Sequence, residues 1–323
     1  MHAILVDRPG GPDALHYRET PVPQPATGQV LVKIAASGVN FIDCYHRSGL
    51  YPIAPKPFTP GMEAAGTIEA LGPGVEGFAP GDRVAYASSI GSYAEYAVVP
   101  AQVLVRVPEG VDLADAAALM LQGLTAQYLA EDTFHLKPGD IALVHAGAGG
   151  VGLLLTQLAK SRGATVITTV STSAKAELSK AAGADHVLNY TEIDFKDEAR
   201  KLTGGRGVDV VYDSVGKTTF DKSLESIRPR GLLALFGASS GPVPPFELQR
   251  LSANGSLFIT RPTLFNHISE PGELTKRAAE LFAAVASGAL KLRIGHRYPL
   301  AEAARAHTDL EGRATTGKLL LIP

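Results

Sequence analysis

A single glycine-rich stretch, HAGAGGVG at residues 145–152, limits the possible folds of this chain more than any other feature. A short apolar run at 141–144 precedes it, and a helix-like segment follows it. Its glycines satisfy the pattern G-x-G-x-x-G at Gly147, Gly149 and Gly152. Glycines in such a turn allow the tight reversal from strand to helix, the approach of a pyrophosphate to the backbone, and close packing of the helix on the sheet. The stretch therefore predicts a dinucleotide-binding turn.

The segments after this turn continue the alternation of strands and helices that a dinucleotide-binding domain needs. The helix would begin near Gly150 and Val151, so its N–H groups and positive dipole end would hold the phosphate charge. Apolar runs then alternate with helix-like segments, and the six runs are 141–144, 165–170, 186–190, 208–216, 231–237 and 256–260. Near-continuous apolar strands between helices are typical of a doubly wound parallel sheet that is buried on both faces. The sequence predicts an α/β domain here.

The first 110 residues follow a different pattern, rich in strands and turns. Alternating runs at QVLVKIAASGVN, AAGTIEAL, DRVAYAS and YAEYAVVP are separated by Pro- and Gly-containing turns. This pattern indicates an irregular barrel or sandwich. From Asp112 the pattern becomes helical, and after Pro262 an amphipathic helix leads to two short strand-like runs around a helix.

Charge and composition exclude several classes of function. The chain has 30 Lys and Arg against 32 Asp and Glu, so no nucleic-acid partner is expected. No apolar run approaches the roughly 18 residues of a membrane span. Cys44 is the only cysteine, which rules out intrachain disulfides, and Asp7 and Pro9 come too early for a signal peptide. A cytoplasmic location is expected.

Several motifs together resemble the medium-chain dehydrogenase/reductase superfamily, and within it the zinc-independent quinone oxidoreductases related to zeta-crystallin. They occur in family order across the whole chain: GVNFIDCYHRSGLYP, PGMEAAG, GDRVAY, GLTAQYL, HAGAGGVG, VYDSVG, FGASSG, TRP and RATTGKLLLIP. The resemblance implies a GroES-like, β-rich catalytic domain at residues 1–124 and 264–323, with a Rossmann cofactor domain at 125–263 inserted in it. It also implies a homodimer.

The positions that hold zinc in related alcohol dehydrogenases carry different residues here. Zinc members of the superfamily have a Cys and a His where this chain has Asn40 and Met62. A catalytic zinc needs about three N, S or O ligands from the protein, and an amide or a thioether serves this metal poorly. Cys44 and His46 lie close in sequence, but no third ligand accompanies them. The sequence therefore predicts no metal, which disfavours alcohol oxidation because no Lewis acid would stabilise the alkoxide.

The end of the second Rossmann strand predicts the coenzyme. NAD-selective sites place a carboxylate there, about 20 residues beyond the glycines, on the ribose diol. This chain has Thr-Val-Ser at 169–171 and no carboxylate, and Lys175 follows four residues after Ser171. A lone lysine in the first turn of a helix is usually only a solvated charge. In the resembling family, however, the matching lysine binds the 2′-phosphate of NADPH and the matching serine lies beside it, so NADPH is the expected cofactor.

The resemblance implies further cofactor contacts, each with an ordinary packing alternative. Tyr190 would pack near the adenosine, and Arg313 would reach toward the adenosine phosphate. The residues expected at the nicotinamide end are Asn40, Thr125, Phe236, Ser239 and Arg261. Many relatives have Asn where this chain has Ala238, so one side-chain contact is expected to be missing there.

The family uses the segment GVNFIDCYHRSGLYP to face the nicotinamide, which makes Asn40, Tyr45 and Tyr51 the candidate catalytic residues. Asn40 can donate and accept hydrogen bonds, so it could orient the carboxamide of the cofactor or the acceptor oxygen. Each tyrosine combines an aromatic wall with a phenol donor, which suits a flat quinone ring, although a loop tyrosine often only packs. Positioning alone can lower barriers by ~7–11 kcal/mol, so a quinone could be reduced without a dedicated acid.

Three functions remain open at this point. The leading one is NADPH-dependent, zinc-independent reduction of small quinones. The second is NADPH-dependent reduction of enones or 2-alkenals, which needs a proton donor at the substrate α-carbon, with a tyrosine as the candidate. The third is a non-catalytic role, as an NADPH-binding structural protein or RNA-binding sensor. The physiological acceptor and the choice between one- and two-electron reduction also stay open.

Overall fold

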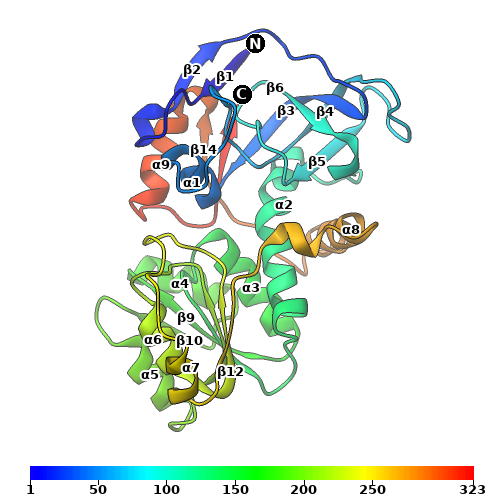
Figure 1. The fold of residues 1–323 in the computed structure, drawn as a ribbon. Coiled ribbons are helices and arrows are strands. Elements are labelled where there is room, and N and C mark those ends of the chain that lie inside the picture. Colours follow the sequence, from blue (N-terminus) through cyan, green and yellow to red (C-terminus); the bar gives the residue numbers. More distant parts are fainter. The chain divides into compact units, whose positions relative to one another are not determined.

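The computed structural model describes residues 1–323, which form two compact units. The first unit comprises residues 1–124 and 268–323, and the second unit comprises residues 125–267. Figure 1 colours the chain from N- to C-terminus and labels the elements of each unit. The sequence predicted that the cofactor domain ends at residue 263, whereas the second unit extends to residue 267. The short helical turn η4 (Leu264–His267) therefore belongs to the second unit.

The second unit is built on a six-stranded sheet with the strand order β10-β9-β8-β11-β12-β13. Its strands are β8 (Ile141–Val144), β9 (Thr165–Val170), β10 (His186–Asn189), β11 (Val208–Asp213), β12 (Ile227–Leu235) and β13 (Phe258–Thr260). Every neighbouring pair is parallel, which confirms the predicted doubly wound sheet. The strand order reverses at β8 and β11, and open α/β sheets bind their ligands at such a point.

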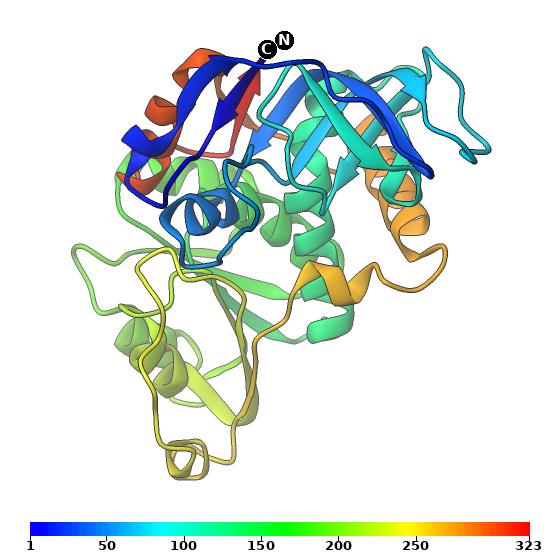
Figure 2. The ribbon, with the colours of Figure 1, turned by 45° about the horizontal axis from the view of Figure 1, so that its top comes forward.

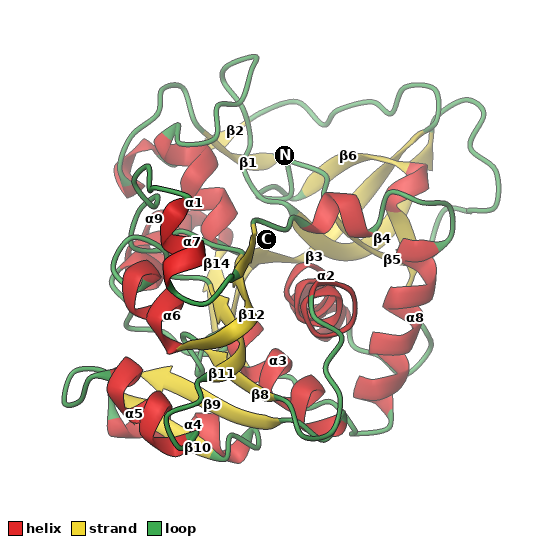
Figure 3. Cartoon of the chain, turned by 60° about the horizontal axis from the view of Figure 1, so that its bottom comes forward, coloured by secondary structure: helices red, strands yellow, loops and turns green.

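The helices of the second unit cover both faces of its sheet. They are α3 (Gly150–Ser161), α4 (Ser173–Ala181), α5 (Phe195–Leu202), α6 (Phe220–Ser226) and α7 (Gln249–Ala253). Figure 1 shows α5 and α6 on one side of the sheet and α3 on the other, and Figure 3 shows α4 beside β9 and β10. Because both faces are covered, Leu143, Val211 and Leu233 are fully buried, which explains the continuous apolar runs.

The first unit is built on a seven-stranded sheet with the order β14-β15-β3-β4-β5-β7, and β6 pairs with β3. Its strands are β3 (Gln29–Val39), β4 (Glu63–Leu71), β5 (Arg83–Ala87), β6 (Tyr96–Pro100), β7 (Leu104–Arg106), β14 (Ile294–Pro299) and β15 (Lys318–Ile322), with β1 (His2–Leu5) and β2 (His16–Glu19) as a separate pair. Strand β15 runs antiparallel to β3, with Leu319 opposite Val39. The C-terminal segment thus completes the GroES-like sheet, and Figure 2 shows both termini on one side of this unit.

The segment after Asn40, which was expected to be a loop, is helical. Residues Phe41–Ser48 form α1 instead. The carboxylate of Asp43 accepts the N–H of Asn40 at 2.8 Å, and Gly49 ends the helix at a left-handed φ of 82°. An acidic residue at the third position and a terminal glycine are recognised helix signals, so this sequence already carried the information.

The chain has three further helices and four single helical turns. They are α2 (Leu113–Tyr128), α8 (Glu273–Ala286) and α9 (Ala303–Glu311), with single turns η1 (Pro12–Ala14), η2 (Ala101–Val103), η3 (Leu129–Thr133) and η5 (Leu300–Glu302). The chain passes from the first unit to the second within α2, at residue 124.

Candidate active site

The glycine-rich turn lies at the carboxyl end of β8, in the middle of the parallel sheet. Ala146 in this turn adopts a left-handed φ of 54°. A Cβ atom at Gly147 would lie 2.6 Å from Cβ of Thr168, and one at Gly152 would overlap the carbonyl oxygen of Ala146. Only glycine fits at these two positions, because the turn packs directly against the strand and the helix packs directly against the turn.

The N-terminus of α3 supplies the groups that can hold an anion. Gly149 precedes the helix in an extended conformation, and Gly150 and Val151 form the start of its first turn. The first N–H groups of a helix have no partner within it, and the helix dipole adds partial positive charge at the same end. The predicted phosphate-binding geometry is therefore built from backbone groups, which suits the pyrophosphate of a dinucleotide.

The imidazole of His145 anchors the start of this turn, although the sequence analysis gave it no role. Its Nδ1 lies 2.9 Å from Oγ1 of Thr169 in β9, and its Nε2 lies 2.9 Å from Oγ of Ser223 in α6. Ser223 donates at 2.9 Å to the carboxylate of Asp213, at the end of β11. Ser223 therefore accepts from Nε2–H, and Nδ1 accepts from Thr169. Burial lowers the pKa of His145, in agreement with a neutral ring.

The structure brings together the residues expected at the adenosine end of the cofactor. Lys175 lies in the first turn of α4, with Nζ 3.5 Å from Oγ of Ser171. Tyr190 follows β10, and its backbone N–H donates to the carbonyl of Val170 at 3.0 Å, so it lies at the end of the neighbouring strand. No carboxylate occupies the end of β9, at 169–171. An ammonium and a hydroxyl at a helix N-terminus suit a phosphate rather than a ribose diol.

The residues expected at the nicotinamide end lie on loops that follow β12 and β13, and on α2. The N–H of Phe236 donates to the carbonyl of Asp213 at 2.9 Å, and that of Ser239 donates to the carbonyl of Ser214 at 3.1 Å, which ties the loop after β12 to the end of β11 and its loop. Thr125 lies in the second half of α2 and is buried. The backbone of this region is thus fixed by hydrogen bonds between adjacent loops.

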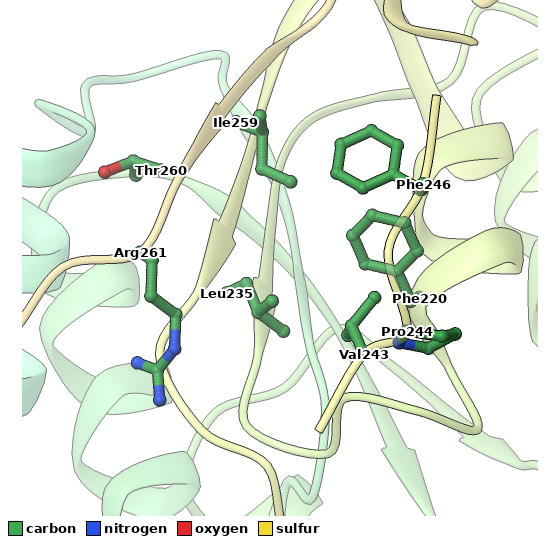
Figure 4. Close-up of a pocket in the computed structure, with 8 residues that line it drawn as sticks. All are labelled: Phe220, Leu235, Val243, Pro244, Phe246, Ile259, Thr260 and Arg261. Carbon is green, nitrogen blue, oxygen red and sulfur yellow. The ribbon is translucent and has the colours of Figure 1, made fainter. Parts of the chain in front are cut away.

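Arg261 lines an open cavity of about 370 Å³ at the edge of the sheet. The other lining residues are Phe220, Leu235, Val243, Pro244, Phe246, Ile259 and Thr260. Figure 4 shows Arg261 on the side opposite Phe220 and Phe246, whose rings meet edge to face at 5.0 Å. Arg313 lies in the first unit, after α9, with a left-handed φ of 57°. The contact of Arg313 with the adenosine phosphate therefore stays a prediction.

The structure places Tyr45 and Tyr51 against one another in the first unit. Tyr45 lies on α1 and Tyr51 follows it, with their ring centroids 5.2 Å apart in an edge-on arrangement. Phe41 adds a third ring 6.3 Å from Tyr45. Tyr51 exposes 37% of its surface, so these rings form a partly open aromatic wall. Such a wall suits the face of a flat, apolar ring.

Asn40 is buried at the start of α1, within a polar network that the sequence analysis missed. Its Nδ2 donates to Glu63 in β4 at 2.7 Å, and its Oδ1 accepts from Lys318 in β15 at 2.9 Å. Gln122 in α2 also donates to Oδ1, at 3.2 Å. Lys318 is 278 residues away from Asn40 in the chain, so no local pattern could have indicated the pair.

The donor set around Asn40 does not suit zinc. Asn40 itself is engaged by a carboxylate and an ammonium, and a cation beside Lys318 would meet like charge. Sγ of Cys44 lies 3.4 Å from Nδ1 of His307, a nitrogen to which Arg47 also donates at 3.1 Å. Burial raises the pKa of the Cys44 thiol, which disfavours the thiolate that binds metals. No group of three or more His, Cys, Asp and Glu side chains is arranged to hold a metal ion.

A second network of buried polar side chains packs against α1. The hydroxyl of Tyr93 donates to Asp43 at 3.0 Å and lies 3.0 Å from Nε2 of His307. Burial raises the pKa of Asp43 to about 7 and lowers the pKa of His307 to about 3. Since Asp43 also accepts the N–H of Asn40, the protonation of this carboxyl acts on the first turn of α1.

The folded protein is expected to lose stability as the pH rises toward 7 because of Asp43. Its pKa is raised by burial from 3.8 to about 7, so the folded state keeps a proton that the unfolded chain releases. The free energy of unfolding should therefore fall by a few kcal/mol between about pH 4 and about pH 7 from this group. Asp43→Asn should remove this part of the pH dependence, as measured by urea unfolding at both pH values. An unchanged pH dependence in the variant would contradict the assignment to Asp43.

Two known families match the two parts of the chain. The family described as "Alcohol dehydrogenase GroES-like domain" matches residues 26–109, and that described as "Zinc-binding dehydrogenase" matches residues 150–279. Among known proteins, a quinone oxidoreductase of Pseudomonas aeruginosa is 46% identical, with 97% of each chain covered. A 2-haloacrylate reductase of a Burkholderia species is 44% identical, with 99% of this chain and 98% of that chain covered.

Solved structures show the same similarity. The structure of the Escherichia coli quinone oxidoreductase complexed with NADPH is 43% identical, covers 100% of both chains, and superimposes with a TM-score of 0.98.

Proposed function

Because this chain belongs to the quinone oxidoreductase branch of the medium-chain dehydrogenase/reductase superfamily, we propose that it transfers reducing equivalents from NADPH to small quinones without zinc. The chain is an oxidoreductase, and NADPH is its reductant. The observation that carries this proposal is the pairing of Ser171 with Lys175 at the end of a strand without a carboxylate, beside the glycine-rich turn. NADPH, when bound, supplies the hydride.

The residues of this chain divide the remaining tasks. The turn at 145–152 and the start of α3 would bind the pyrophosphate, and Lys175 with Ser171 would bind the 2′-phosphate. Tyr45 and Tyr51 would hold the quinone ring by its face. Holding the ring correctly is itself a large contribution to the rate, because a good acceptor needs little electrophilic help.

Independence from zinc is part of this proposal, despite the name of one matching family. Asn40 and Met62 stand where zinc relatives have ligands, and Asn40 is already engaged by Glu63 and Lys318. This donor set supports the proposal, because a catalytic zinc is held by about three N, S or O ligands from the protein.

One relative favours a second candidate function, the reduction of a carbon–carbon double bond next to a carbonyl. The Burkholderia protein is a 2-haloacrylate reductase, and the similarity covers nearly the whole of both chains. A 2-haloacrylate is an α,β-unsaturated acid, whereas enones and 2-alkenals carry an uncharged carbonyl. Either reaction would need a proton donor at the α-carbon, and Tyr45 or Tyr51 is the candidate.

Assembly and location complete the proposal. Strand β13 forms one edge of the six-stranded sheet, and Phe258 on it exposes 62% of its surface. Leu248 nearby in sequence exposes 73%. An open strand edge with exposed apolar residues is suited to pairing with a second copy, which supports the proposed homodimer. The single, buried cysteine is consistent with the proposed cytoplasmic location.

None of the helices is long and apolar enough to cross a membrane.

Steady-state turnover with NADPH tests the proposal directly, using a panel of benzoquinones and naphthoquinones against a panel of 2-alkenals and 2-haloacrylates. Quinones are expected to give the higher kcat/KM, and treatment with a chelator is expected to leave this turnover unchanged. Higher kcat/KM for the alkenes would establish the second candidate instead. Activity that is lost on chelation and restored by zinc would contradict independence from the metal.

A further inference from the structure

A buried ion pair joins two strands of the first unit. Lys318 begins β15 and Glu63 begins β4, and their side chains expose 1% and 0% of their surface. The ammonium and the carboxylate are in direct contact. Taking two charges out of water costs so much hydration free energy that such pairs can often be replaced by apolar residues without loss of stability. Stability alone therefore does not explain why Lys318 and Glu63 form a buried ion pair.

The backbone makes room for the pair at Gly38. This residue lies on β3, opposite Leu320 of β15. A Cβ atom at Gly38 would lie 2.6 Å from Cε of Lys318 and would overlap the carboxylate of Glu63. Gly38 has no positive φ, so the glycine is required here for space and not for its conformational freedom.

The partners of Asn40 determine how its amide is oriented. Oδ1 accepts from Lys318 and from Gln122, and Nδ2 donates to Oε1 of Glu63. The other oxygen of Glu63 accepts the backbone N–H of Leu121 at 2.6 Å, which holds the carboxylate in place. An ammonium only donates and a carboxylate only accepts, so a flipped amide would set donor against donor and acceptor against acceptor. Only one orientation of the Asn40 amide is compatible with this network.

The fixed orientation limits what Asn40 can offer to a substrate. Both lone pairs of Oδ1 have partners, whereas Nδ2 uses one of its two N–H groups. Asn40 can therefore act toward a substrate only as a hydrogen-bond donor. The ammonium of Lys318 on Oδ1 also polarises the amide, which strengthens that donor.

We infer that Lys318 and Glu63 are positioning residues, which hold Asn40 so that its remaining N–H donates to the quinone oxygen on which negative charge develops. The inference rests on the proposed quinone reduction. In that reaction the quinone would gain a hydrogen and two electrons as a C–H bond of NADPH breaks and an O–H bond forms, leaving NADP⁺. The other quinone oxygen would become a phenolate, and a proton from water would complete the hydroquinone and leave hydroxide. A well-placed donor to a developing oxyanion is worth about 10²–10³ in kcat.

The test combines Lys318→Met with Glu63→Gln in the full-length protein. Each single variant leaves one charge buried without its partner, so the Tm should fall by several degrees. The double variant should recover most of this Tm. The N–H of Leu121 would hold the carbonyl oxygen of the new amide at position 63, so its NH2 group would face Asn40 and oppose the native orientation of the Asn40 amide. We expect kcat for quinones to fall at least tenfold in the double variant, with the Kd for NADPH unchanged.

Binding of a product analogue supplies a readout that does not depend on turnover. The probe is 4-nitrophenol, titrated below and above its own pKa. The wild-type protein should bind the phenolate more tightly than the phenol, and the double variant should lose this preference. Lys33→Met, at an exposed lysine of β3, is the matched control and should change none of these quantities. If the double variant does not fold, Asn40→Asp, which keeps the contact with Lys318 but has no side-chain N–H, should show the same losses.

The outcomes separate the two proposals. Full kcat and full phenolate preference in the double variant, or in Asn40→Asp if the double variant does not fold, would overturn the positioning role while leaving quinone reduction intact. Absence of quinone turnover in the wild type would refute the proposed function, and the phenolate titration would then decide the inference alone.

Discussion

Replacing Gly152 by alanine is expected to weaken NADPH binding by about a hundredfold or more. A Cβ atom at this position would overlap the backbone carbonyl of Ala146, and no side-chain rotation can relieve a clash with backbone. The helix start must then move away from the turn, which removes N–H groups from the pyrophosphate. Each lost hydrogen bond to a charged group is worth ~1.5–3 kcal/mol, so two of them account for this loss.

Fluorescence titration of the variant with NADPH measures this effect. Gly312→Ala is the control, because this glycine ends α9 with an ordinary φ of −70° and a Cβ there would be no closer than 3.1 Å to the nearest atom, the carbonyl oxygen of Thr308. It should bind NADPH like the wild type. Wild-type affinity in Gly152→Ala would mean that the helix can shift without cost, and that the close packing of α3 on the turn does not serve the cofactor.

Lys175→Ala should raise the Kd for NADPH by roughly 10- to 150-fold and leave that for NADH nearly unchanged. The reason is that a hydrogen bond to a charged phosphate contributes about 1.5–3 kcal/mol, and only NADPH carries the 2′-phosphate. The position of Lys175 beside Ser171, in the first turn of α4, is the basis for this expectation.

Lys180→Ala provides the matched control for this second experiment. Lys180 lies on the same helix and forms an exposed ion pair with Glu177. Its replacement changes the net charge as much as Lys175→Ala does, but it leaves Lys175 and Ser171 at the end of β9 unchanged. It should affect both coenzymes by less than twofold, because the contribution of an exposed pair is small. An equal loss of both coenzymes in Lys175→Ala would show that this lysine does not read the 2′-phosphate.

The second unit could be predicted from the sequence almost element by element, because its signals are local. Each strand is an apolar run because helices cover both faces of the sheet. The glycine spacing at 145–152 is typical of one local structure, the turn from a strand into a helix. Ser171 and Lys175 are four residues apart, so a short pattern was enough to find them.

The first unit was harder to predict, because its site is assembled across the chain. Asn40, Glu63 and Lys318 meet through strands that are distant in sequence, and each looks ordinary in its own segment. A lysine that begins a C-terminal strand gives no sign of being buried. His145 was overlooked for a similar reason, since its partners Thr169 and Ser223 lie 24 and 78 residues further on.

The pairing of β15 with β3 also orders the events of biosynthesis. The second unit is a continuous segment and is complete once residue 267 has been translated, whereas the sheet of the first unit still lacks β15. At about 5–20 residues per second, a ribosome needs roughly 3–10 s more to reach Lys318. During this interval Glu63 has no counter-ion, and the edge of β3 that β15 will cover stays open to other strands. Misassembly of the nascent chain thus threatens most the N-terminal segment, which is translated first.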